Sequence, residues 1–298
     1  LNGFQAWTRE TYADTLSKIE AGSPSLVFFD VLFFSPSNGI KADELLSVAQ
    51  ESTDSMAFAE NVMSYAEDPH PYDETFANVL AEHENVYMVK NTLGEPVWNG
   101  SGFEISGETL PLALFEAEAK SGFATVIDTE ESENSSIIFA IPLVYSLDGN
   151  EESHIDLQLA EAHLGSSPNI PTEAGQMLIN YAAPAYSYPM ISFSDVYYDR
   201  IDPSEFEGKI VLIGATAAIL QDRHFTPIDQ DTPMPGVEIH ANAIQTMLDG
   251  AYLEYQSTAG FIVMVGLIVA VSTFVFLFAP VLAAAGFLVL EIVAFPFY

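Results

Sequence analysis

The stretch GKIVLIGATAAILQDRHFTP, Gly208 to Pro227, decides between two kinds of α/β protein. Its β-branched and apolar run ends in Gly-Ala-Thr, which predicts a strand that either feeds a phosphate-binding loop or simply ends. A dinucleotide site requires glycines spaced G-x-G-x-x-G, and a Walker loop requires Gly-Lys-Ser/Thr. The residues after the strand supply neither, so the spacing excludes both nucleotide motifs. We therefore expect a buried strand from Lys209 to Ile213, with a tight exit at Gly214.

Helix and strand patterns alternate on both sides of this stretch. The segment after Trp7 has apolar residues at helical spacing and is expected to end at Gly22 as its C-cap. The run PSLVFFDVLFF follows and is apolar almost throughout, as in a strand buried on both faces. Further helices are expected around 42–65, 72–83, 154–164 and 237–248, strands at 86–89, 137–144, 177–181 and 209–214, and hairpin or loop ends at 128–136 and 146–153. This alternation predicts an α/β fold, a sandwich of helices on a mainly parallel or mixed sheet, followed by transmembrane helices.

Acidic residues dominate the composition. The chain has 42 Asp plus Glu against 8 Lys plus Arg, a formal net charge of −34. Such a surface repels polyanions, so no nucleic-acid partner is expected. We interpret the acid excess mainly as a solvation device, as in proteins that stay soluble in concentrated salt. The absence of cysteine excludes disulfides, thiolate metal sites and a cysteine nucleophile.

The sequence becomes strongly apolar near Tyr255. From 259 to 279 no charge interrupts AGFIVMVGLIVAVSTFVFLFA, a run long enough to cross a hydrocarbon core of about 30 Å. Pro280 breaks this run before a second apolar segment begins. We therefore expect an extracytoplasmic domain at residues 1–256, a transmembrane helix at 257–279 and a second, truncated transmembrane helix at 281–298.

The second apolar segment contains one charge, Glu291. A carboxylate within a span normally faces a partner or a polar cavity, which makes Glu291 a candidate for coupling between helices; hydration near the interface is the alternative. Because the chain stops inside this segment and starts without Met, we expect further sequence before Leu1 and after Tyr298. The acidic Glu254 and the lack of Lys or Arg near the first span favour a location of residues 1–256 outside the cytoplasmic membrane.

Acids and histidines follow the predicted strand at 209–213. Carboxylate and imidazole groups of this kind bind Zn²⁺, Mn²⁺ or Ca²⁺, although their spacing matches neither an EF-hand nor a His-Glu-x-x-His site, so the metal is unknown. In open α/β sheets, ligands bind at the carboxyl ends of the strands, where the run FFDVLFF also ends. We therefore expect a divalent cation, or else a small polar solute, at the candidate ligand-binding residues Asp30, Asp222, His224, Asp229 and Asp231.

Two of the polar residues in this region also have structural interpretations. His240 shares a helical face with Val237 and Ile244, so we expect a core histidine with one backbone or carboxylate partner rather than a ligand. Asp222 alternatively caps or pairs with Arg223 or a neighbouring amide.

A longer stretch around this region, residues 191–253, resembles the C-terminal signature of a sensory family. The matching elements are GKIVLIG at 208–214, ATA at 215–217, Asp222, TP at 226–227 and the stretch PGVEIHANAIQTML at 235–248. The runs LINYAAP and LVFFDVLFFSP, and Trp7 with Arg9, resemble upstream parts of the same pattern. The family is the CHASE domain of type two, the cyclase- and histidine-kinase-associated sensory extracellular domain.

The resemblance implies a membrane signalling receptor whose sensor lies outside the cytoplasmic membrane. Transmembrane helices would follow, then a cytoplasmic adenylate or guanylate cyclase or, as the alternative, a histidine or Ser/Thr kinase. Because such output enzymes usually act as dimers, we expect a homodimer. No catalytic residue and no cofactor is expected in this chain.

Two other function classes stay open. An extracytoplasmic hydrolase requires a matched nucleophile and base, and the sequence contains no Gly-x-Ser-x-Gly elbow. A membrane-anchored structural envelope protein would explain the acidity and the anchor, but not the loop with Asp222 and His224.

Overall fold

A computed structural model describes residues 7–37, 50, 54, 56–57, 71–128, 137–217, 220, 222–254, 256–278 and 286. The chain forms two compact units, Leu1–Leu253 and Glu254–Tyr298. The helix expected around 42–65 and the second apolar segment with Glu291 lie almost wholly outside the described residues.

The first unit is built on a mixed, mainly parallel sheet, as predicted. Its strands are β12 (Ile210–Gly214), β1 (Leu26–Asp30), β2 (Val86–Thr92), β5 (Glu108–Thr109) and β6 (Lys120–Phe123). β1 pairs in parallel with β12 and with β2, and β2 pairs in parallel with β6. β5 pairs antiparallel with β2. The strand predicted from the run LVFFD is therefore a central one, with a partner on each side.

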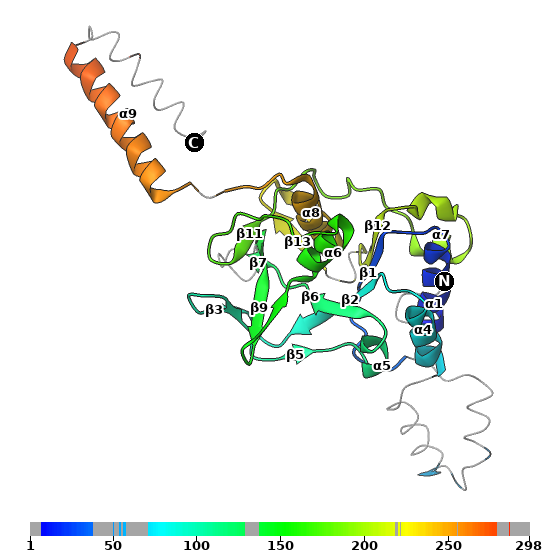
Figure 1. Cartoon of the computed structure of the whole chain (residues 1–298). Helices are drawn as coiled ribbons and strands as arrows, with labels where there is room; N and C mark the ends of the chain where they lie inside the picture. Colours follow the sequence, from blue (N-terminus) through cyan, green and yellow to red (C-terminus); the bar gives the residue numbers. More distant parts are fainter. Residues whose placement is uncertain are drawn as a thin grey trace. The chain divides into compact units, whose positions relative to one another are not determined.

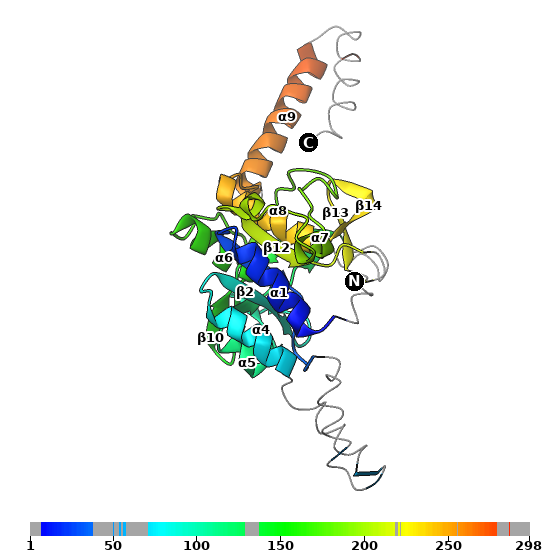
Figure 2. The same cartoon turned by 90° about the vertical axis from the view of Figure 1, so that its right-hand side faces the viewer.

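Both faces of this sheet are covered, and β1 explains why. Successive side chains of a strand point to opposite faces. Val27 and Phe29 pack with the helices α1 (Arg9–Glu20) and α4 (Pro71–Ala81), whereas Leu26 and Phe28 pack with α6 (Ile155–Leu164) and α8 (Gly236–Asp249). The two helical layers lie on opposite sides of β1 and β2 (Figure 1), and α1 and α4 cover the face seen in Figure 2. The almost uninterrupted apolar run is the consequence of burial on two sides.

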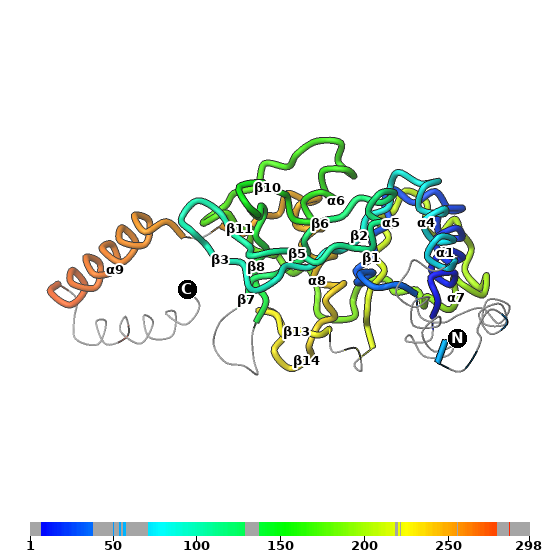
Figure 3. The backbone as a smooth tube through the Cα atoms, turned by 90° about the horizontal axis from the view of Figure 1, so that it is seen from below, coloured from blue at the N-terminus to red at the C-terminus, as the bar shows by residue number. Residues whose placement is uncertain are grey.

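Within the described residues, three smaller sheets complete the unit. Their strands are β10 (Asn150–Ser153), β9 (Val144–Leu147), β4 (Phe103–Glu104) and β3 (Val97–Trp98) in one, β11 (Gln176–Leu178), β8 (Ile138–Pro142) and β7 (Ile127–Asp128) in the second, and β13 (Arg223–Thr226) with β14 (Asp229–Pro235) in the third. The shorter helices are α5 (Ala113–Glu116), α7 (Phe193–Tyr197) and the 3-10 helix η2 (Pro203–Phe206). Figure 3 shows β10 and the β13–β14 hairpin on opposite sides of the central sheet. The hairpin expected at 146–153 is confirmed as β9–β10.

Three details differ from the expectation. Helix α1 has Ala21 as its C-cap, not Gly22 as expected. Glycine is needed at position 22 for a different reason, because a Cβ there would lie 1.9 Å from the carbonyl oxygen of Pro203. β12 is an edge strand among the described strands and only half-buried, because β1 is the one described strand that pairs with it. The stretch 137–144 divides into β8 and the start of β9, since Leu143 lies between strands of two different sheets.

The second unit contains α9 (Thr258–Phe278), an uncharged helix of 21 residues with a mean hydropathy of 2.8 over its most apolar window. By length and composition it is able to cross a membrane, and none of its residues is buried.

Candidate functional site

The carboxyl ends of β1 and β12 meet at one edge of the central sheet. Asp30, the last residue of β1, pairs in parallel register with Gly214, the last residue of β12. Burial raises the pKa of Asp30 to about 6, against an opposing effect from the positive charge on His240. The neighbouring acids Asp222 and Asp156 act in the same direction as burial. The structure thus places two predicted site residues, Asp30 and Asp222, in one electrostatic cluster, which together with His224 is called the edge cluster below.

Helix α8 begins at this edge, and two glycines allow its close approach. A Cβ on Gly214 would lie 2.6 Å from Cβ of Val237, and a Cβ on Gly236 would lie 2.4 Å from Oδ1 of Asp222. The Asp222 carboxylate therefore packs over the first turn of α8, where a negative charge is favourable at the positive end of the helix dipole. Gly214 is needed for packing against α8, which the expected tight exit from the strand did not anticipate.

The side chains of Asp222 and His224, two predicted site residues, are in contact. His224 Nε2 lies 3.3 Å from Asp222 Oδ1, and both side chains are about one-third exposed. Among the described residues this carboxylate packs against Gly236, but it accepts no hydrogen bond from Arg223 or from a backbone amide, the alternatives considered from the sequence. Arg223 instead lies over the ring of Tyr186.

Asp229 and Asp231 lie at the other end of the β13–β14 hairpin. Asp229 pairs with Thr226 at the turn, whereas Arg223, next to Asp222, pairs with Pro235 at the base. The Asp229 carboxylate accepts hydrogen bonds from the backbone N–H groups of Thr232 and Asp231, and these bonds lower its pKa. These two acids thus shape an exposed turn and do not join Asp30 and Asp222.

A buried network extends inward from the edge cluster. Asp156 has no exposed surface, and its two carboxylate oxygens lie 2.9 and 3.0 Å from Nδ1 of His240. Burial alone would lower the pKa of His240, but Asp156, Asp30 and Asp222 together raise it to about 9. His240 is therefore a charged core histidine, and the prediction of a carboxylate partner is confirmed.

His154 shares the same carboxylate region but is neutral. Burial lowers the pKa of His154 to about 4, and the charge on His240 adds to that effect. Its Nδ1 accepts a hydrogen bond from the backbone N–H of Asp156 and so caps α6, while Nε2–H donates to the carbonyl of Thr125. Neither His154 nor Asp156 was singled out in the sequence, because both read as the ordinary start of an amphipathic helix.

A polar row on α8 is a further feature that sequence patterns missed. The Glu238 carboxylate accepts three backbone N–H groups of residues 186–188 at 2.7 to 3.2 Å. Asn242 accepts from Ala182 N–H, and Thr246 accepts from Asn180 N–H. The spacing i, i+4, i+8 places these three side chains on one face of the helix, which binds the segment 180–188.

Metal binding receives no direct support from this geometry. Within the part of the chain that the structure describes, no group of three or more His, Asp or Glu side chains is arranged to hold a metal ion. The edge cluster is therefore a network of paired acids and histidines around the start of α8.

A family model now accounts for the motif around this cluster. The model of the CHASE2 domain matches residues 2–279. The chain belongs to the CHASE2 domain family. CHASE2 domains are extracellular sensory domains, and the match extends through α9, so the family pattern includes the apolar helix. No curated protein and no solved structure matches the chain.

Proposed function

We propose that this CHASE2 chain is the sensory input part of a transmembrane signal-transduction receptor, with residues 1–256 outside the cytoplasmic membrane. The proposed output is a cytoplasmic adenylate or guanylate cyclase beyond Tyr298, with a histidine or Ser/Thr kinase as the second candidate. The proposed receptor is a homodimer, in keeping with output enzymes that act as dimers.

The observation that carries this proposal is the position of α8. Its first turn packs against the edge cluster, and its last residue, Asp249, is followed by only a short segment, 250–257, before α9. A change of ligand or charge at Asp30, Asp222 or His224 thus acts directly on the helix that leads into the membrane span. We propose this edge as the sensing site, with a cation or a small polar solute as its ligand.

The helix is held firmly enough to move as one body. Hydrogen bonds from Glu238, Asn242 and Thr246 attach it to the segment 180–188, and His240 attaches it to α6. Displacement of α8 would then be passed on as rotation or as movement along the axis of α9, with little slack in the connecting segment.

The coupling is tested by joining residues 1–298 to a cyclase catalytic domain in cells that lack their own cyclase. We expect three glycines inserted after Glu254 to abolish the response of cAMP production to external salt and cations while basal activity persists. Three glycines inserted at Gly100, in the exposed β3–β4 turn, serve as the control and should leave the response intact. Glu291→Gln should change the set point. An unchanged response after the insertion at Glu254 contradicts the rigid connection.

The location is tested separately and uses the absence of cysteine from the chain. A single cysteine introduced at Asn150 in the exposed hairpin should react in intact cells with a maleimide that does not cross membranes. Reaction only after the cells are made permeable would place the domain on the inner side.

A further inference from the structure

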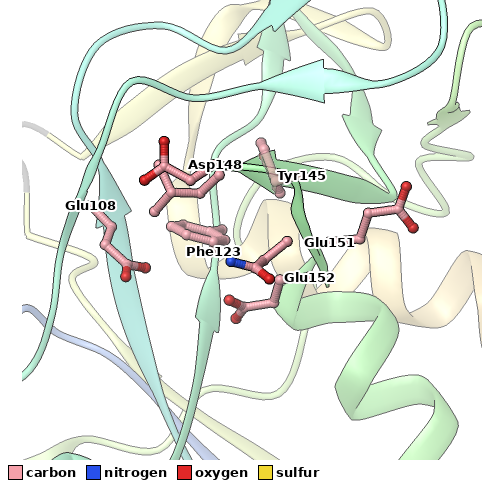
Figure 4. Close-up of a pocket in the computed structure, with 8 residues that line it drawn as sticks. Glu108, Phe123, Tyr145, Asp148, Glu151 and Glu152 are labelled. Atoms are coloured by element: carbon pink, nitrogen blue, oxygen red, sulfur yellow. The ribbon is translucent and has the colours of Figure 1, made fainter.

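A cavity of about 190 Å³ lies away from the edge cluster, between β5, β6 and the β9–β10 hairpin. Figure 4 shows its lining, which combines aromatic rings with acids. The rings are those of Phe123 and Tyr145, and both side chains are almost fully buried. The acids are Glu108, Asp148, Glu151 and Glu152, and none of the described residues that line the cavity is Lys, Arg or His.

One wall of this cavity already binds an ammonium group from the chain itself. The Lys90 Nζ lies 2.6 Å from Glu152 Oε2, 3.3 Å from Glu108 Oε2 and 4.5 Å from the centre of the Phe123 ring. The Lys90 side chain is buried there, on β2. Two carboxylates and an aromatic face are the surroundings that stabilise an organic cation in proteins. This wall thus already surrounds one ammonium group with carboxylates and an aromatic ring.

Lys90 neutralises only part of the negative charge at the cavity. Its single positive charge is shared by Glu108 and Glu152. Asp148 and Glu151 have no cationic partner among the described residues. The cavity thus keeps unpaired acids beside two rings. The Tyr145 hydroxyl already donates a hydrogen bond to the carbonyl of Thr125, so Tyr145 contributes its apolar ring to the cavity wall.

The distribution of these acids indicates the shape of the ligand. No three of them are arranged around one point at metal-ligand distances, within the described part of the chain. A bare metal ion also gains nothing from an apolar floor, whereas a carbon skeleton gains from burial against Phe123 and Leu147. We infer that this cavity binds a small organic cation, an aliphatic amine or diamine whose positive charges are spread along a carbon chain.

The site is continuous with the buried network that reaches α8. β10 ends at Ser153, and the next residue, His154, caps α6. The Tyr145 ring stacks on the ring of His154, with 6.1 Å between their centres. Binding itself needs only the cavity and is measured on this chain without any output domain, so its failure leaves the proposed sensory function standing, and the reverse also holds.

Calorimetry on the full chain in detergent micelles tests the inference, with 1,4-diaminobutane as the probe in about 0.15 M salt. We expect saturable binding, weakened about tenfold in the double variant Asp148→Asn, Glu151→Gln, since each lost charge contact contributes roughly 0.7 kcal/mol. Asp148 has φ 51°, a conformation that asparagine adopts readily, so this substitution preserves the turn.

The matched control is Glu10→Gln, Glu207→Gln, which removes two exposed acids from other parts of the unit. It should change the affinity less than about twofold. Equal weakening in both variants would show that the diamine responds to net charge alone and overturn the inference. Absence of saturable binding, or Mg²⁺ binding to the cavity as tightly as the diamine, would overturn it as well.

Discussion

The charged state of buried His240 leads to a measurable pH dependence of stability. Its pKa is about 9 in the folded chain against an ordinary value of 6.5. One pKa unit corresponds to about 1.4 kcal/mol, so the acids around His240, Asp156 foremost, stabilise the fold by about 3 kcal/mol when His240 is fully protonated. Removing one partner of a buried ion pair typically costs a similar amount of stability.

The direction follows from which state releases its proton first. Below about pH 6.5 both states hold the proton on His240, and the full stabilisation is present. Between pH 6.5 and about 9 the unfolded chain loses the proton while the folded chain keeps it, so the free energy of unfolding falls. The shifts of Asp30 and His154 act below about pH 6.5, because their folded pKa values are about 6 and about 4.

The measurement is urea unfolding of the full chain in detergent micelles at fixed salt, followed by tryptophan fluorescence. Both tryptophans, Trp7 and Trp98, lie in the first unit. We expect the parent to lose about 3 kcal/mol between pH 6.5 and 9. His240→Gln keeps a hydrogen-bond donor for Asp156. Its free energy of unfolding should be about 3 kcal/mol lower than that of the parent at pH 6.5 and should change little as the pH rises.

The control is His163→Gln, at an exposed histidine that contacts the Ser25 hydroxyl. It should retain the pH dependence of the parent. If His240→Gln and the parent lose the same free energy between pH 6.5 and 9, His240 is not charged in the folded chain and the reasoning fails.

Three further predictions concern packing, the row on α8 and the acidic surface. Gly236→Ala should cost about 1–3 kcal/mol because its Cβ meets the Asp222 carboxylate, and adding Asp222→Ala should recover most of that loss; additive effects of the two changes in urea unfolding would contradict the contact. Glu238→Gln should cost about 2 kcal/mol, since the charge accepts three N–H groups of residues 186–188, whereas the exposed Glu207→Gln should stay within about 0.5 kcal/mol. The melting temperature should rise between about 0.01 M and 1 M salt, as the Debye length falls from about 30 Å to 3 Å; a flat response would show that repulsion among the acids does not limit stability.

The layers of the fold were predictable because they rest on local patterns. The apolar run of β1 and the periodicity of α1 and α8 report burial directly. The position of a strand within its sheet is not local, since β12 resembles β1 in composition but has a neighbour on only one side. The same limit applies to the stretch 137–144, whose two halves enter sheets with partners far away in the sequence.

The candidate site was predictable where residues lie near the carboxyl end of a predicted strand, as Asp30 and Asp222 do, or lie close together in the sequence. Asp222 and His224 are two residues apart and are in contact. Asp229 follows only seven positions after Asp222, but the hairpin places it at the opposite end, where its carboxylate accepts hydrogen bonds from its own turn. Asp156 lies 84 positions before His240, and no periodicity relates the two. The central ion pair is therefore visible only when the fold is known.

The two sides of α8 differ in how they would respond to a shift of the helix. Its apolar side, with Ile239, Ala243 and Met247, packs without directional bonds, and such contacts tolerate small sliding movements. Its polar contacts are directional, because a hydrogen bond weakens steeply when its geometry is lost. A shift of α8 must therefore carry the segment 180–188 along or break the bonds of Glu238, Asn242 and Thr246. We expect the segment to move with the helix, since breaking these bonds leaves buried polar groups unpaired, and the helix and the segment then act as one mechanical element.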